Sequence, residues 1–560
     1  MNKKIALGCL LVFEFLFANA QKSDIAVPSA VQYQWQERER IMFVHFGVAT
    51  WTGNEYDETG KFDISRLNPS KLNTDQWCEV AKSWGAKEII FVAKHVGGFC
   101  WWPTKTTEYC VRNIPWKNGK GDLMKEVAAS CKKYGIKMGV YIYPGDVAYG
   151  AGIGSGGKTK DPSLQEAYNK VFRQQLTEVL TNYGEMAEVW FDGNCVVEVG
   201  DILKKYASKA TIFQSPYASL RWPGTESGKL SYPVWNTVPS GRLKLGLATQ
   251  YDDTPDGDAW APLEADAPLY DHYWFWSKEK EKKRKSLEEL IDMYYKSVGY
   301  GGNLLINSCP DTTGLIVPDD VSLYRAFGAE LQKRFEKPVA QLKLPIAINP
   351  ILHFQKPTAI NHIVLEEQYQ YGHRIRAYTI EAKVNGKWVE IAKGESVGRK
   401  KIEAFKTITT TDIRINVTKN KLAPNWRSVS AYHVSNFEPS VTIQNDPEWK
   451  VCGSYDTKTF KNGADTLVLN LDSFITKPGQ YEIAMVADVA ITGTYIVETY
   501  LEFDGENTQQ EYLQKTGHSS FNINRTAQID RNSHTKLTLY MKSDNEVFQN
   551  RGVFKIRARR

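Results

Sequence analysis

The feature that most constrains this chain is a regular alternation of short apolar runs with amphipathic stretches, between about residues 40 and 335 of its 560. The apolar runs predict strands at 41–46, 88–93, 137–143, 187–192, 211–214, 233–236 and 303–307. The stretches between them have helical periodicity, at 74–84, 121–134, 163–183, 198–207, 286–298 and 319–335. This repetition of strand and helix favours an α/β fold, a parallel (β/α)8-like TIM barrel rather than an open sheet.

The pattern changes after residue 337, where helical periodicity stops and short alternating runs begin. These runs predict strands at 359–365, 375–384, 387–392 and 412–417, and then at 467–471, 479–486, 494–503 and 536–541. We therefore expect a barrel in residues 21–336, a β-sandwich in 337–440, and a second β-sandwich of unknown role in 443–560.

The first twenty residues differ from the rest. Lys3 and Lys4 precede an apolar run from Ile5 to Phe17, and Ala18-Asn19-Ala20 supplies small residues for cleavage. This order is typical of a secretory signal peptide, so residues 1–20 predict export to the periplasm or the medium, with Gln21 as the first mature residue. A lipoprotein box at Cys9 is the alternative. The apolar run is too short for a membrane span.

Composition excludes several classes of function. The net charge of +6 is small for this length and forms no stripe, so no nucleic-acid partner is expected. The dense run Lys278–Lys285 mixes signs and predicts a solvated helix face. Eight cysteines show no metal-ligand spacing, and Cys100 and Cys110 are either a disulfide or two buried apolar side chains. No metal or cofactor is expected, and the oligomeric state stays open.

Polar side chains lie at the ends of four predicted strands, His45, His95, Tyr141 and Asp192. In a barrel of this kind the catalytic residues lie at the carboxyl ends of the strands. Asp192 follows the apolar run Val189-Trp190-Phe191, where a carboxylate either caps the next helix or carries chemistry. Aromatic neighbours suit a sugar, because pyranose C–H faces pack on rings.

Nine short motifs occur in order along the chain, and as a set they are specific enough to indicate a family. They are H-F-G (45–47), G-N-E-Y (53–56), D-Q-W (75–77), A-K-H-V-G-G-F (93–99), N-G-K-G-D (118–122), G-V-Y (139–141), E-V-W-F-D-G (188–193), R-W-P-G-T-E-S-G (221–228) and G-G-N-L-L-I-N (301–307). In this set the chain resembles the α-L-fucosidases of glycoside hydrolase family 29, above all the branch that prefers α-1,3/1,4-linked fucose. Residues 354–367, 372–375 and 386–394 resemble the discoidin-like (F5/8 type C) domain found behind that branch's barrel.

The resemblance implies a role for each matching residue. Asp192 is the expected nucleophile of a retaining exo-glycosidase and Glu226 its acid/base; the expected sugar-binding residues are His45, Glu55, Tyr56, His95, Tyr141 and Trp190. The substrate would be a fucosylated oligosaccharide or glycoconjugate. A His or Tyr donor should hold the pKa of Asp192 low, while a dry setting near Asp192 should keep Glu226 protonated. The two carboxyls of a retaining enzyme lie about 5–5.5 Å apart.

The chain also departs from the family pattern. Val96 and Gly97 stand where H-H-D-G-F has His and Asp, Tyr56 stands for a Trp, Ala49 for an Asn, and residues 268–276 contain no arginine. The loss of an imidazole changes the recognition of sugar hydroxyls. Two alternatives therefore stay open: a related α-L-glycosidase such as an α-L-galactosidase, and a non-catalytic glycan-binding protein on a degenerate barrel. The retained Asp192 and Glu226 favour the enzyme.

Overall fold

The computed structural model describes residues 25–57, 59–246, 248–435 and 437, together with the strands between residues 450 and 559. The expected signal peptide, residues 1–20, lies outside the described residues. No helix in the described part of the chain is long and apolar enough to cross a membrane.

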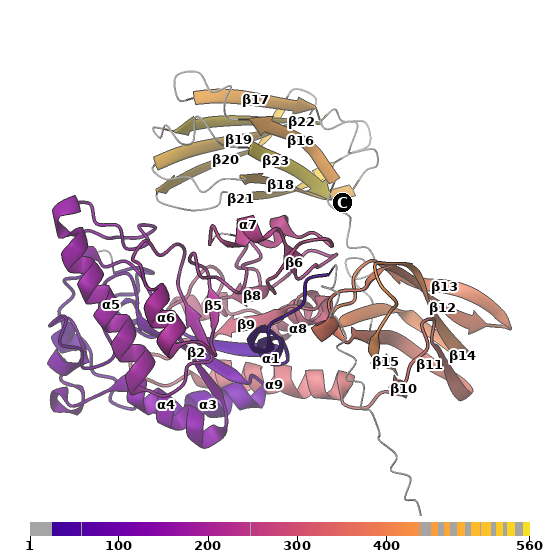
Figure 1. Cartoon of the computed structure of the whole chain (residues 1–560), viewed down its shortest axis with the longest axis horizontal. Coiled ribbons are helices and arrows are strands. Elements are labelled where there is room, and N and C mark those ends of the chain that lie inside the picture. Colours follow the sequence, from indigo (N-terminus) through magenta and orange to yellow (C-terminus); the bar gives the residue numbers. More distant parts are fainter. Residues whose placement is uncertain are drawn as a thin grey trace, which may run out of the picture.

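Seven parallel strands form the central sheet, in the order β5-β4-β3-β2-β1-β9-β8 (Figure 1). Their bounds are β1 Arg40–Val44, β2 Glu88–Lys94, β3 Lys137–Ile142, β4 Glu188–Trp190, β5 Thr211–Phe213, β8 Glu264–Ala267 and β9 Asn303–Asn307. Every residue of β2 is buried, as expected for a parallel strand covered on both faces. The predicted mixed α/β class is confirmed, in the form of a parallel half-barrel.

Closure of the sheet differs from the expected eight strands. Between β5 and β8, isolated parallel bridges join Phe213 to Leu220 and Arg221 to Leu263, so an irregular segment spans the gap. The strand predicted at 233–236 is wrong, because this stretch is irregular and contains Pro233, which has no N–H to donate to a ladder. Beyond it, β6 (Thr237–Val238) pairs antiparallel with β7 (Ala259–Trp260).

Strand β8 was absent from the prediction for a physical reason. Its sequence, Glu-Ala-Asp-Ala, alternates acids with alanines and carries no apolar signal, yet Glu264 and Asp266 are buried inside the sheet. A buried carboxyl is rare unless it is partnered or functional, so this strand already indicates a special interior.

The helices cover the sheet and link its strands (Figure 1). They are α1 Ala30–Gln36, α2 Val48–Thr52, α3 Thr74–Ser83, α4 Leu123–Tyr134, α5 Gln165–Asn182, α6 Gly200–Tyr206, α7 Ser240–Leu243, α8 Leu287–Lys296 and α9 Pro318–Phe335. All six predicted helices are present. Local signals set their ends: Ser286 and Glu289 form a capping box at α8, and Asp122 accepts from the Lys125 N–H at α4.

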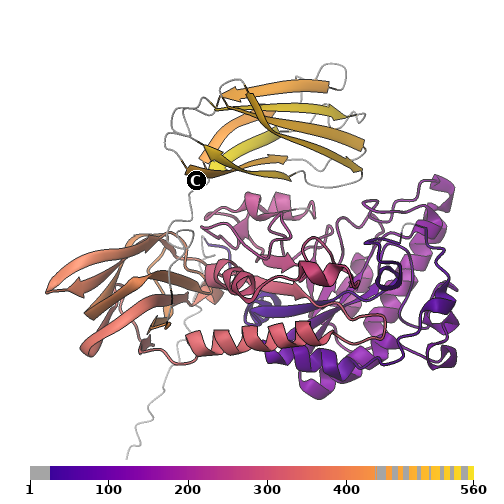
Figure 2. The same ribbon diagram turned by 180° about the vertical axis from the view of Figure 1, so that it is seen from behind.

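A six-stranded antiparallel sheet follows α9, which leads to it from the barrel (Figure 2). The sheet order is β10 (Ala340–Lys343), β15 (Trp426–Tyr432), β11 (Ile351–Glu367), β14 (Lys401–Asn420), β12 (Ile375–Val384) and β13 (Lys387–Gly394). It has its own apolar core around Trp426 and Tyr378. We call this unit, residues 340–432, the second domain.

Two further antiparallel sheets lie in the C-terminal part. Their orders are β16 (Lys450–Asp456), β23 (Val553–Arg559), β18 (Gly479–Ala487), β21 (Asn522–Ile529), and β17 (Ala464–Asn470), β22 (Thr535–Ser543), β19 (Thr494–Phe503), β20 (Glu506–Thr516). The strands predicted here are all present, and paired four-stranded sheets are a sandwich-like arrangement.

Cys100 and Cys110 lie on neighbouring backbone segments but are not joined. Both are free and buried, and their thiols face the carbonyl oxygens of Gly98 and Thr104. The disulfide alternative is therefore wrong, and the two cysteines act as small buried side chains.

Candidate active site

The polar residues predicted at strand ends converge in the fold. Aromatic ring centroids lie 6.2 Å apart for His45 and His95, 5.9 Å for His45 and Tyr141, and 5.7 Å for His95 and Tyr141. These residues come from the ends of β1, β2 and β3, which are neighbours in the sheet. Parallel strands bring their carboxyl ends to one edge, so residues far apart in sequence meet here.

Asp192 lies just beyond β4, and the Tyr141 hydroxyl donates to its Oδ2 at 3.0 Å. Asp192 is exposed, yet neighbouring protein atoms remove much of the water around its carboxyl group. This partial burial raises the pKa of Asp192 above its ordinary value, and the Tyr141 hydrogen bond opposes the rise. The expected donor is present, but the prediction of a lowered pKa is wrong in direction.

Trp190 forms the floor beside Asp192. Its ring stacks on Phe213, with centroids 4.1 Å apart, and on Tyr141 at 5.4 Å. The indole N–H donates to Glu264 Oε2 at 2.9 Å. Burial raises the pKa of Glu264 to about 8, so this carboxyl is protonated near neutral pH and the floor of the site is uncharged there.

His45 is held in one tautomer by Asn307, which sequence reasoning did not single out. The Asn307 Nδ2 donates to the Trp274 carbonyl at 2.7 Å, so its Oδ1 faces His45 Nδ1 at 2.9 Å. An amide oxygen only accepts, so Nδ1 carries the proton and Nε2 is left as an acceptor. Burial lowers the pKa of His45 well below its ordinary value. A neutral imidazole can therefore accept a hydrogen bond from a sugar hydroxyl.

His95 lies between two tyrosine rings. It stacks on Tyr141 and on Tyr56, with centroids 5.7 and 6.1 Å away, and Tyr56 is 46% exposed at the rim of the site. Burial lowers the pKa of His95 to about 4, so it too is neutral near pH 7.

Glu55 makes its contacts with protein groups. Its Oε1 accepts from the backbone N–H groups of Trp274 and Phe275, the latter at 3.2 Å, and its Oε2 lies 2.8 Å from Lys280 Nζ. Glu55 thus anchors the loop that carries Trp274. Lys280 is 7% exposed, so the prediction of a solvated face for its charged run is wrong at this position.

Glu226 lies within the irregular segment between β5 and β8, and its side chain is exposed. Trp274, a second residue that the sequence reasoning did not assign, donates its indole N–H to Glu226 Oε2 at 3.1 Å. The expected dry setting is wrong. The dry carboxyl nearby is Asp266, which accepts from Trp222 Nε1 at 2.8 Å. Burial raises the pKa of Asp266 well above its ordinary value, and the charge of Glu226 adds to the rise.

Comparison with known proteins places these residues in a family. A family model described as alpha-L-fucosidase matches residues 22–336. The chain belongs to the α-L-fucosidase family. It is therefore a glycoside hydrolase by family.

Individual relatives agree with this assignment. Alpha-L-fucosidase 1 of Arabidopsis thaliana is 29% identical over 457 residues, which cover 71% of this chain and 86% of that protein. A solved Bacteroides thetaiotaomicron VPI-5482 protein assigned as an α-L-fucosidase is 33% identical with a TM-score of 0.69, over 73% of this chain and all of the other. A glycoside hydrolase 29 family member from an unknown rumen bacterium is 26% identical with a TM-score of 0.66, over 93% and 96% of the two chains.

One of the departures from the family's H-H-D-G-F motif, Gly97, borders a cavity beside His95. Its lining also includes Ala49, Asp57 and Phe275, and its volume is about 320 Å³ when the open solvent at its mouth is counted. A Cβ placed on Gly97 would lie 2.4 Å from Asp57 Oδ2, so Asp57 fills the space that a side chain at 97 would take. Asp57 Oδ2 also accepts from the Tyr109 hydroxyl at 2.7 Å. The chain thus brings a carboxylate to this wall from a different loop.

Within the described residues no group of three or more His, Cys, Asp or Glu side chains could hold a metal ion. The structure brings the predicted His45, His95, Tyr56, Tyr141, Trp190 and Asp192 together at one end of the sheet, with Glu55 and Glu226 joined to them through Trp274. Their roles toward a sugar stay predictions.

Proposed function

We propose that the chain is a secreted, retaining α-L-fucosidase that removes terminal α-1,3/1,4-linked L-fucose from glycans, with Asp192 as nucleophile and Glu226 as acid/base. The observation that carries the proposal is the pairing of the strand-end Asp192 with the Tyr141 hydroxyl at 3.0 Å, where the Tyr141 ring packs on Trp190 and His45. Membership of the α-L-fucosidase family supplies the reaction class.

The chemistry follows from the two carboxyls. The Asp192 carboxylate forms a bond to the anomeric carbon while the bond from that carbon to the leaving oxygen breaks, and Glu226 gives its proton to that oxygen. Glu226 then takes a proton from water, which attacks the anomeric carbon and releases Asp192. The Tyr141 hydrogen bond to Oδ2 favours the ionised form of Asp192, against the rise in its pKa from desolvation, and orients the other oxygen.

In this proposal, neutral imidazoles and aromatic rings bind the sugar. His45 offers Nε2 as an acceptor, since Asn307 fixes its proton on Nδ1. His95 is uncharged near neutral pH, and Trp190 and Tyr141 provide apolar faces for pyranose C–H groups.

The test is turnover of 4-nitrophenyl α-L-fucoside by the wild type, Asp192→Ala and Glu226→Ala, with the anomeric form of the first product read by NMR. We expect α-L-fucose first, loss of turnover in Asp192→Ala, and a glycosyl azide from Glu226→Ala with azide. Asp201→Ala is the matched control, because this exposed aspartate lies on α6, the helix after Asp192, and pairs with Arg173 of α5. No turnover by the wild type on this substrate or on a branched fucosylated oligosaccharide would overturn the proposal.

Two finer parts of the proposal rest on sequence. The R-W-P-G-T-E-S-G motif around Glu226 supports the linkage preference, and comparing α-1,2- with α-1,3- and α-1,4-fucosylated oligosaccharides tests it. The signal-like residues 1–20 support export, and N-terminal sequencing of the exported protein should give Gln21 first. The discoidin-like assignment of the second domain is supported by its six-stranded antiparallel sheet.

An α-L-galactoside is the second candidate, favoured by the cavity beside His95. L-galactose differs from L-fucose by one added hydroxyl, and the cavity is lined by Ala49 and Gly97 and offers an acceptor in Asp57, which packs against Gly97. The ratio of kcat/KM for the two 4-nitrophenyl glycosides decides between them. If the hydroxyl binds here, Asp57→Ala lowers galactoside turnover more than fucoside turnover.

A further inference from the structure

The segment that carries Glu226 is long and has little ladder structure of its own. It runs from residue 214, after β5, to residue 263, before β8, and we call it the excursion. Its described residues contain the short pair β6–β7 and one turn of helix, α7. Scattered backbone hydrogen bonds hold it, such as Gln250 N–H to the Trp222 carbonyl and Gly228 N–H to the Asp266 carbonyl, and side-chain contacts add to them where the segment has no regular ladder.

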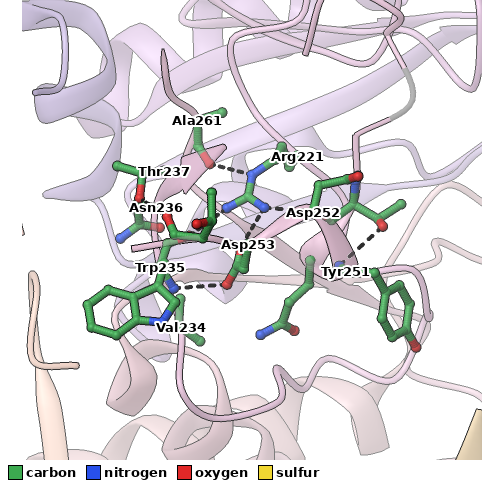
Figure 3. A network of polar contacts seen from close by, with 12 residues as sticks. Arg221, Val234, Trp235, Asn236, Thr237, Tyr251, Asp252, Asp253 and Ala261 are labelled. Atoms are coloured by element: carbon green, nitrogen blue, oxygen red, sulfur yellow. Dashed lines mark hydrogen bonds and ion pairs between the residues drawn. The ribbon is translucent and has the colours of Figure 1, made fainter. Parts of the chain in front are cut away.

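Arg221 ties four separate points of the excursion together (Figure 3). Its guanidinium donates to the carbonyls of Ala261 at 2.6 Å, Thr249 at 2.9 Å and Trp235 at 2.8 Å, and to Asp253 Oδ1 at 2.5 Å. Arg221 is fully buried and lies five residues before Glu226. The planar guanidinium with its fixed donors sets the distances between these points.

The second domain makes hydrogen bonds to the stretch of the excursion next to Trp235. The Tyr232 hydroxyl donates to the Ser396 carbonyl at 3.0 Å and accepts from the Glu395 N–H at 2.7 Å. The Val234 N–H donates to Ser396 Oγ at 3.2 Å. These contacts hold the stretch that supplies Trp235 O to Arg221.

Two further residues of the second domain, His373 and Arg376, also contact the excursion. His373 Nε2 accepts from the backbone N–H and the side-chain Nδ2 of Asn236, at 3.3 and 3.1 Å, and the ring is 1% exposed. Arg376 Nη2 donates to the Pro255 carbonyl at 2.6 Å and its guanidinium lies 4.8 Å from the centroid of Trp235. His373 is the central contact, because it holds the residue next to Trp235 with two hydrogen bonds.

We propose that His373 of the second domain is a positioning residue for the acid/base: through Asn236, Trp235 and Arg221 it fixes the excursion that aims Glu226 at the leaving oxygen. The proposal rests on the proposed role of Glu226. The second domain then serves the reaction without touching the sugar. Loss of His373 would affect the step in which the Glu226 proton moves to the glycosidic oxygen as that bond breaks, and spare attack by Asp192.

Two substrates with different leaving groups distinguish a role in positioning Glu226 from a role in the stability of the fold. A 2,4-dinitrophenolate leaves without protonation, whereas a sugar alcohol needs the acid, which contributes about 10²–10⁴-fold. We compare kcat/KM for 2,4-dinitrophenyl α-L-fucoside and for a fucosyl disaccharide. His373→Leu should lower the disaccharide value by about tenfold and leave the dinitrophenyl value within about twofold, since small misplacements near a reacting centre reduce rates by such factors.

Two further variants test whether the effect of His373→Leu comes from the lost acceptor. His373→Gln keeps an acceptor and should recover most of the disaccharide value. Arg374→Ala is the matched control, because Arg374 is a half-buried neighbour whose Nη1 donates to the Ala423 carbonyl within the second domain. It should leave both values unchanged.

The outcomes are distinct. Equal loss on both substrates, or no loss on the disaccharide, overturns the positioning role. If Glu226→Ala itself shows no difference between the two leaving groups, the acid/base assignment fails, and the positioning role fails with it. If His373→Leu does not fold, Ser396→Ala, which removes one hydroxyl acceptor, carries the same test with an expected loss of about threefold on the disaccharide only.

Discussion

The two carboxyls of the site are held by different kinds of structure. Asp192 follows a strand that is paired on both sides, and its donor Tyr141 comes from the adjacent strand. Glu226 lies on the excursion, which has little regular strand pairing. There the side chain of Arg221 and hydrogen bonds from the second domain hold the backbone. A parallel sheet therefore fixes the proposed nucleophile through backbone pairing. The proposed acid/base lies on a segment that is held in part by buried side chains, which can be removed one at a time.

The largest expected effect comes from Arg221→Met. The change removes a buried cation and leaves the Asp253 carboxylate and three carbonyls without their donor, which destabilises a protein by about 3–5 kcal/mol. We also expect kcat/KM for a fucosyl disaccharide to fall by about 100-fold, through the loss of acid geometry. Steady-state kinetics and thermal unfolding measure the two effects.

Arg242→Met is its control. Arg242 lies on the same excursion and pairs with Asp252 at 2.7 Å, but its side chain is 30% exposed. It should change stability by less than about 1 kcal/mol. A similar collapse in both variants would mean that the excursion is generally fragile and that Arg221 has no special place in it.

Tyr141→Phe tests the nucleophile side. Hydrogen bonds to a charged group contribute about 1.5–3 kcal/mol, so kcat/KM should fall by roughly 10–100-fold on every leaving group. The lost donor stabilised the carboxylate, so the pKa of Asp192 rises further. Asp192 must be ionised to attack, and the acidic limb of the pH–kcat/KM profile therefore moves to higher pH. An unmoved limb would show that the hydroxyl does not sense the charge of Asp192.

The same division explains what could be predicted from sequence. The strand runs ending at His45, His95 and Asp192 were visible because parallel strands buried on both faces are apolar throughout. Strand β8 was missed because its buried Glu264 and Asp266 look like surface residues. Asn307 and Trp274 were missed because their value lies in contacts across the sheet, at sequence separations of 262 and 48 residues. A linear pattern does not report such pairs.

Trp274 touches both sides and should give a smaller effect. Its ring lies 5.0 Å from His45 and its N–H donates to the exposed Glu226. Trp274→Phe keeps most of the packing and removes the donor, which is worth about 0.5–1 kcal/mol at an exposed acceptor, so kcat/KM should fall by about twofold to fivefold. The loss should be greater for a disaccharide than for a dinitrophenyl glycoside. Equal losses would assign Trp274 to sugar packing alone.

The smallest effect is expected where the second domain meets α1 at the surface. Arg427 binds Glu37 through both guanidinium nitrogens, at 2.7 and 3.0 Å, but the Arg427 side chain is 37% exposed. Water screens such a pair, so Arg427→Ala should lower stability by less than about 1 kcal/mol and lose even this difference in 1 M salt. Arg399, 6% exposed and 2.5 Å from Glu39, is the matched buried cation, and Arg399→Ala should cost about 3–5 kcal/mol. Thermal unfolding at low and high salt compares them. Equal losses of stability in the two variants would mean that surface ion pairs hold the second domain as strongly as buried ones do. Its buried contacts with the excursion would then have no greater part in fixing that domain.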